Sequence, residues 1–208
     1  SPPSAIRSCW SRSLTAPPTA IVSFLSATIC EGDTLQLSSS GGGTYSWQPA
    51  IGLSSAQVSS PLAFPADSTN YRLVVSNSFN CSDTAFVNID VVKKPIANAG
   101  ADKTAITGLP VTLDGIAGGD NISFVWSPAF YLDNPFLIQP TATPPAGTYD
   151  YRLTVTSNDG CGSVTDMVKV TVYDGVYVPT AFTPGNNGLN DRWQVIAPPS
   201  LPGFEISV

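Results

Sequence analysis

An internal repeat with a period of about 80 residues constrains the fold of this chain more than any other feature of its sequence. Trp47 lies 79 residues before Trp126, and Val87 lies 81 residues before Val168. The matching segments are Trp47–Pro49 with Trp126–Pro128, Leu53 with Leu132, Tyr71–Leu73 with Tyr151–Leu153, Cys81 with Cys161, and Val87–Val91 with Val168–Val172. Because order and spacing are both kept, the sequence predicts two tandem units of one fold.

Composition and periodicity predict that each unit is made of strands. The 208 residues include 19 Pro and 17 Gly but few Glu, Lys or Leu, which argues against long helices. Short segments alternate apolar and polar residues, as half-buried strands do. These segments are Thr34–Leu37, Tyr71–Val75 and Thr84–Val92 in the first copy, and Val111–Asp114, Tyr151–Val155 and Val164–Tyr173 in the second. A period of 80 residues suits a small immunoglobulin-like sandwich, so the predicted fold class is all-β with tandem immunoglobulin-like sandwiches.

The repeated aromatic residues are interpreted as parts of the core. Trp47 and Trp126 take the place of the buried tryptophan on a central sandwich strand. Tyr71 and Tyr151 open the penultimate strand, where a tyrosine corner would lie.

Composition shifts mark four segments along the chain. Residues 1–16 form a Ser-rich tail whose Cys9-Trp10 is a candidate end of a preceding repeat. Residues 17–94 and 95–175 are the two sandwich domains, joined by Lys93-Lys94-Pro95. Residues 176–208 do not belong to the repeat and are predicted to begin a third, partial β domain.

The second copy resembles a PKD domain, an immunoglobulin-like module of secreted bacterial proteins. The resemblance rests on Asn98–Asp102, Gly108–Gly115, Trp126–Pro128 and Tyr151–Val155, and the first copy is similar but more diverged.

The last segment resembles the start of the gliding-motility-associated C-terminal domain of Bacteroidetes, on Val178–Pro184 and Gly188–Asp191. That resemblance implies export by the type IX secretion system and an extracellular or outer-surface location. One acidic residue of the family's usual run is missing from Gly185–Gly188.

Four cysteines in a secreted all-β chain are expected to be paired. We predict Cys30–Cys161 across the junction between the copies and Cys9–Cys81 at the N-terminal end. In a sandwich, Cys30 and Cys81 would lie at opposite ends of a strand, roughly 17–20 Å apart, which is beyond the reach of a disulfide. The alternative pairing is Cys30–Cys81 within the first copy.

No catalytic or strong metal-binding constellation is present in the sequence. The chain has no His, which removes the Ser-His-Asp and Cys-His arrangements, and no enzymatic activity or cofactor is predicted. Calcium is the one candidate ion, on Asp102, Asp114, Asp120 and Asp133, although aspartates in loops more often form turns. The net charge of −6 disfavours nucleic acid, and no apolar run is long enough to span a membrane.

Two kinds of surface site complete the candidates. Ser68 and Thr84 lie in Asp-Ser/Thr patterns similar to those O-glycosylated in Bacteroidetes. Phe130-Tyr131 and Phe136 are candidates for a carbohydrate platform, but we expect Tyr131 and Phe136 to pack in the core.

These features predict a non-catalytic stalk or scaffold segment of a large secreted or cell-surface protein, with a role in adhesion or gliding. Its expected partners are the secretion machinery, neighbouring domains of the same protein, and a polysaccharide or surface protein. One alternative is a spacer in a secreted polysaccharide- or protein-degrading enzyme. The other is a glycan-binding adhesin or a subunit of a self-assembling filament.

Overall fold

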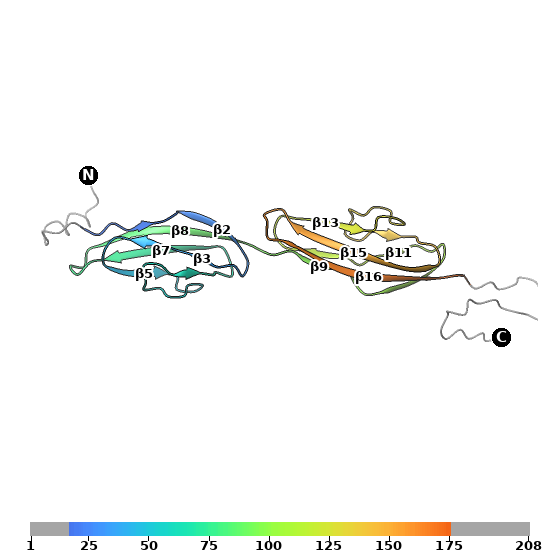
Figure 1. The fold of residues 1–208 in the computed structure, drawn as a ribbon, viewed down its shortest axis with the longest axis horizontal. Coiled ribbons are helices and arrows are strands. Elements are labelled where there is room, and N and C mark those ends of the chain that lie inside the picture. The colour runs from blue at the N-terminus through green and yellow to red at the C-terminus, as the bar shows by residue number, and fades with distance from the viewer. Residues whose placement is uncertain (1–16, 176–208) are drawn as a thin grey trace, which may run out of the picture. The chain divides into compact units, whose positions relative to one another are not determined.

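The computed structural model describes residues 17–175, and these divide between Lys94 and Pro95 into two compact units. All regular elements in this range are β-strands, which confirms the predicted all-β class (Figure 1). No helix in the described range has the length and apolar character needed to cross a membrane. The predictions for residues 1–16 and 176–208 lie outside the described residues.

The first unit contains eight strands. They are β1 (Ile21–Val22), β2 (Ser26–Cys30), β3 (Leu35–Gln36), β4 (Ser39–Ser40), β5 (Thr44–Gln48), β6 (Leu62–Ala63), β7 (Thr69–Ser76) and β8 (Ser82–Val92). A four-stranded sheet has the order β2-β8-β7-β5, and the short strands pair as β1-β4 and β3-β6.

The second unit repeats this topology strand for strand. Its strands are β9 (Ile96–Asn98), β10 (Lys103–Ile106), β11 (Val111–Thr112), β12 (Ile116–Gly118), β13 (Ile122–Ser127), β14 (Thr141–Ala142), β15 (Gly147–Ser157) and β16 (Ser163–Tyr173). The large sheet has the order β10-β16-β15-β13, with β12-β9 and β11-β14 as the short pairs.

Strand pairing within each large sheet is mixed. The two long strands form an antiparallel hairpin, β7 with β8 and β15 with β16. By contrast, β2 runs parallel to β8, from Ser26 opposite Asn88 to Cys30 opposite Val92. In the same way β10 runs parallel to β16. An early strand of each unit is therefore paired with its last strand.

Each core lies between the large sheet and the short strand pairs. Alternate residues of β7, Tyr71, Leu73 and Val75, are fully buried, while Arg72 between them is exposed. The period of two that predicted these strands therefore describes their burial. The two core clusters are matching sets of apolar side chains, one centred on Trp47 and the other on Trp126.

The predicted burial of the two tryptophans is confirmed, but not on a central strand. Both are 1% exposed, although β5 and β13 are edge strands of their sheets. The loop that follows each strand covers this edge: the Trp47 backbone N–H donates to Ala56 O at 2.8 Å, and its indole Nε1–H donates to Val58 O at 3.0 Å. Trp126 donates in the same way to Pro135 O and Ile138 O.

The tyrosines are also buried, and each forms a hydrogen bond between its strand and the loop that covers the sheet edge. The Tyr71 hydroxyl donates to Ile51 O at 3.0 Å, and the Tyr151 hydroxyl donates to Phe130 O at 3.3 Å. These acceptors lie 20 and 21 residues upstream, much further along the chain than in a tyrosine corner.

The predicted strands differ from the observed ones mainly at the start of each unit. Thr34–Leu37 and Val111–Asp114 contain only the two-residue strands β3 and β11. The parallel strands β2 and β10 were not predicted. Both are short, at five and four residues, and each pairs with the last strand of its unit, far along the chain.

Candidate functional site

The loop after the tryptophan strand has the same framework in both units. Ser54 N–H donates to Leu62 O, and Leu62 N–H donates back to Ser54 Oγ at 2.9 Å. In the second unit Asp133 and Thr141 form the same pair of bonds, with the carboxylate in place of the hydroxyl, again at 2.9 Å. The backbone of this loop is therefore fixed in the same way by different side chains.

One position of this shared loop differs between the units. Gly52 has φ of 73°, and Tyr131, which stands 79 residues later, has φ of 66°. A Cβ atom on Gly52 would lie 2.8 Å from both Pro65 Cα and the Tyr71 hydroxyl, so the first unit requires glycine there. The second unit instead places a tyrosine in the left-handed region, which L side chains adopt at a cost of roughly 1–2 kcal/mol.

Tyr131 belongs to a group of rings on the surface of the second unit. Its ring lies edge-on to Phe130 with centroids 5.3 Å apart and to Tyr149 of β15 with centroids 5.5 Å apart. Phe130 is 56% exposed and Tyr131 is 46% exposed. We call Phe130, Tyr131 and Tyr149 the aromatic cluster.

The expectation that Tyr131 and Phe136 pack in the core is wrong. Phe136 is 69% exposed, and the left-handed backbone at residue 131 leaves the Tyr131 ring at the surface. Tyr149 was not among the residues that the sequence singled out. Its only signal was an aromatic residue two positions before the buried Tyr151.

The cluster influences the buried phenol beneath it. Burial raises the pKa of Tyr151 to about 12, and the neighbouring Tyr149 and Tyr131 phenols add to the rise. Burial also raises the pKa of Tyr71 in the first unit. Both tyrosines therefore remain protonated hydrogen-bond donors at neutral pH.

A pH series should isolate the contribution of Tyr151. An unfolded tyrosine titrates near pH 10, so the folded-state pKa of about 12 predicts that stability is fully present below pH 10 and falls between pH 10 and 12. Tyr151→Phe should lower stability by about 0.5–1.5 kcal/mol at pH 8, because Phe130 O loses its donor. The same substitution should also reduce the loss of stability between pH 10 and 12. Urea unfolding of both proteins at several pH values checks this, and parallel profiles would contradict it.

The four candidate calcium ligands are not gathered into one site. Asp102 accepts the Lys169 backbone N–H, and Asp114 pairs with the Lys103 ammonium group. Asp133 accepts the backbone N–H groups of Asn134 and Thr141. Within residues 17–175, no group of three or more acidic or cysteine side chains is placed to hold a metal ion. Asp120 also has an interaction partner in the structure.

Cys30, Cys81 and Cys161 are all disulfide-bonded. Strand register places Cys30 opposite Val92, whereas Cys81 directly precedes Ser82, at the other end of β8. Eleven residues separate Cys81 from Val92, which puts Cys30 and Cys81 about 36 Å apart, so they are not bonded to each other. The predicted pairs Cys30–Cys161 and Cys9–Cys81 stay a prediction, and Cys9 lies outside the described residues.

Peptide mapping of the unreduced protein tests this pairing directly. We expect crosslinked peptides that join Cys30 to Cys161 and Cys9 to Cys81, and these should separate on reduction. A Cys9–Cys30 peptide together with a Cys81–Cys161 peptide would contradict the prediction. Mapping at low pH prevents disulfide exchange during digestion.

The two glycosylation candidates are both on the surface, in different settings. Thr84 is exposed on β8, opposite Val74. Ser68 is exposed as a residue, but its Oγ accepts the Val91 N–H at 2.9 Å. Modification of either residue stays a prediction.

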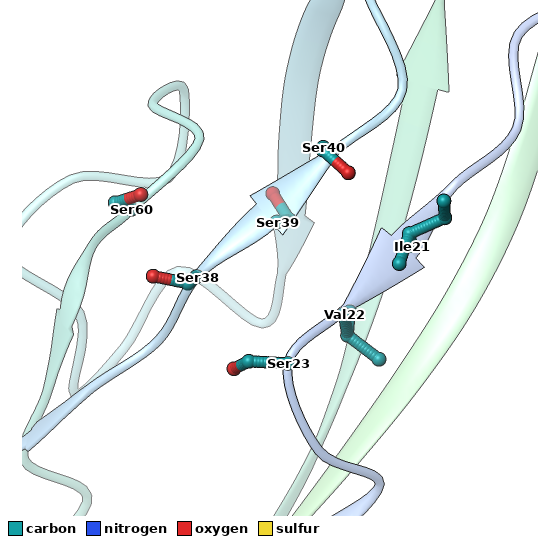
Figure 2. A pocket seen from close by; sticks show the side chains of 7 residues that line it. All are labelled: Ile21, Val22, Ser23, Ser38, Ser39, Ser40 and Ser60. Atoms are coloured by element: carbon teal, nitrogen blue, oxygen red, sulfur yellow. The ribbon is translucent and has the colours of Figure 1, made fainter.

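A shallow hollow of about 240 Å³ lies between β1 and β4 of the first unit (Figure 2). It is lined by two aliphatic and five hydroxyl side chains, Ile21, Val22, Ser23, Ser38, Ser39, Ser40 and Ser60. The Ser39 hydroxyl is already bonded to Ser59 O at 2.7 Å. None of the seven residues titrates near neutral pH, so the hollow contains no group that could activate a serine for catalysis.

Comparison with known proteins places the fold. No protein-family model and no curated protein matches the sequence. The insect immune protein hemolin aligns with a TM-score of 0.52 at 14% identity, covering 79% of this chain and 49% of hemolin. The two immunoglobulin domains of DIP-gamma align at 0.49 and 16% identity, covering 75% of this chain and 97% of theirs.

Extracellular domains 3–5 of Drosophila OTK align with a TM-score of 0.43 at 16% identity. The match covers 75% of this chain and spans about 60% of the OTK chain. At such low identity these likenesses concern the fold alone. Together with the strand topology, the hemolin match confirms that the units are tandem immunoglobulin-like β-sandwiches.

Proposed function

We propose that this chain is a non-catalytic, force-resisting spacer within an extracellular or cell-surface protein. The observation that carries the proposal is the parallel pairing of an early strand with the last strand in each unit. The lack of any His in the chain supports a role without catalysis.

The parallel pairing resists tension because of where the chain runs into and out of the unit. The chain reaches β2 early and leaves from the C-terminal end of β8. With the disulfides reduced, tension along the chain would therefore slide β2 and β8 past each other in opposite directions. The bonds between them, bounded by Asn88 N–H to Leu25 O and by Glu31 N–H to Val92 O, would have to break together.

The connection after β8 is short and is fastened to the first unit. Only residues 93–95 separate β8 from β9. The Lys93 ammonium group donates to Ala66 O at 2.8 Å and to Asp67 Oδ1 at 2.9 Å, and it pairs with Glu31 at 3.4 Å. The hydrogen bond to Asp67 and the charges of Asp67 and Glu31 raise the pKa of Lys93, so this fastening stays charged at neutral pH.

We also propose a family for the two units and a route of export for the protein. The sequence motifs of both units favour the PKD group within the immunoglobulin-like fold. The resemblance of residues 178–191 to the gliding-motility-associated C-terminal domain favours export by the type IX secretion system. Both assignments rest on sequence resemblance.

Single-molecule stretching of the reduced protein tests the mechanical role. Each unit should rupture in one abrupt event that lengthens the chain by about 240 Å, which is the extended length of about 80 residues less the length of the folded unit. Ala27→Pro removes a backbone N–H that the register of β2 directs at β8, so the first unit should rupture at clearly lower force. Ala27→Val, which keeps the N–H, is the matched control. Gradual extension of the wild type, or equal rupture forces for the two variants, would contradict the proposal.

A further inference from the structure

The aromatic cluster of the second unit has features that the fold does not require. Tyr131 O accepts the Thr143 N–H at 2.8 Å, and Gly52 O accepts the equivalent Phe64 N–H at 2.7 Å. A glycine therefore supports the same loop framework without strain. A non-glycine residue held in a left-handed conformation, with its ring at the surface, points to a use for that ring.

The polar ends of the cluster are available to a ligand. Within residues 17–175, no protein group is hydrogen-bonded to the hydroxyl of Tyr131 or of Tyr149, whereas the buried Tyr151 hydroxyl is bonded to Phe130 O. The cluster therefore offers two rings that are about half exposed, beside free phenol groups that can donate and accept.

The ligand class follows from this chemistry. Two of the rings lie on an exposed loop and the third lies on β15, so a small apolar molecule bound there would keep much of its surface in water. Three rings also fall well short of the area that a stable protein interface buries. The net charge of −6 and the neighbouring Asp133 disfavour anionic ligands.

A neutral hexopyranose fits all of these conditions. One face of its ring presents C–H groups to the π faces, and its rim presents hydroxyls to the phenols. We propose that the aromatic cluster is a binding site for neutral hexopyranose units of a polysaccharide. This site does not depend on the mechanical role proposed above.

Titration of the whole chain with oligosaccharides tests the site. The probes are cellohexaose, chitohexaose and laminarihexaose, followed by calorimetry. At least one should bind, and Tyr131→Gly, which restores the residue of the first unit, should weaken that binding at least tenfold. Because glycine relieves the left-handed strain, the melting temperature of this variant should not fall greatly. Phe79→Ala, at an aromatic residue 55% exposed in the first unit, is the control and should bind like the wild type.

Three outcomes would overturn the proposal. One is no heat of binding with any of the three oligosaccharides at millimolar concentration. Another is equal affinity of the wild type and Tyr131→Gly. The third is concentration-dependent dimerisation of the wild type that Tyr131→Gly abolishes, which would make a second copy of the chain the occupant. Should Tyr131→Gly fold poorly, Tyr149→Phe removes only a hydroxyl, and unchanged affinity in that variant would count against the phenol contacts.

Discussion

The structure of each unit depends on burying one tryptophan at the edge of a sheet. An edge strand has a row of backbone N–H and C=O groups that no neighbouring strand pairs with. An indole N–H inside a core also needs a hydrogen-bond acceptor. The loop after β5 meets both needs, because it accepts the backbone and indole N–H groups of Trp47. The loop after β13 does the same for Trp126. Closing the core therefore fixes the conformation of an exposed loop.

This constraint explains how one framework supports different surfaces. The hydrogen bonds that hold the loop are equivalent in the two units. Where the Ser54 hydroxyl accepts a backbone N–H in the first unit, the Asp133 carboxylate accepts one in the second. With the backbone fixed by the core, the exposed side chains are free to differ. Gly52 has no side chain, whereas Tyr131 places an exposed ring at the same position of the second loop. The proposed mechanical role rests on the parallel strand pair that both units have, and the proposed sugar site rests on Tyr131, where the units differ.

The sequence was sufficient for the features that are repeated and local. The matching Trp and Tyr positions, and the alternation along β7, β8, β15 and β16, gave the fold class and the centre of each core. It was not sufficient for β2 and β10, because these strands are short and their pairing joins segments about 60 residues apart along the chain. The exposure of Tyr131 was also missed, because nothing in its local sequence signals a left-handed backbone. Only alignment of position 131 with Gly52 could have suggested it.

The proposed mechanical role requires the parallel pairs β2-β8 and β10-β16 to be stable parts of the two units, and native-state amide hydrogen exchange measures that stability. The account predicts that the bonded amides of Ser26–Cys30 and Lys103–Ile106 are protected nearly as strongly as those of β8 and β16 beside them. If these amides exchanged as fast as those of the exposed loops, the parallel pairs would open readily. The units could not then resist force in the way proposed.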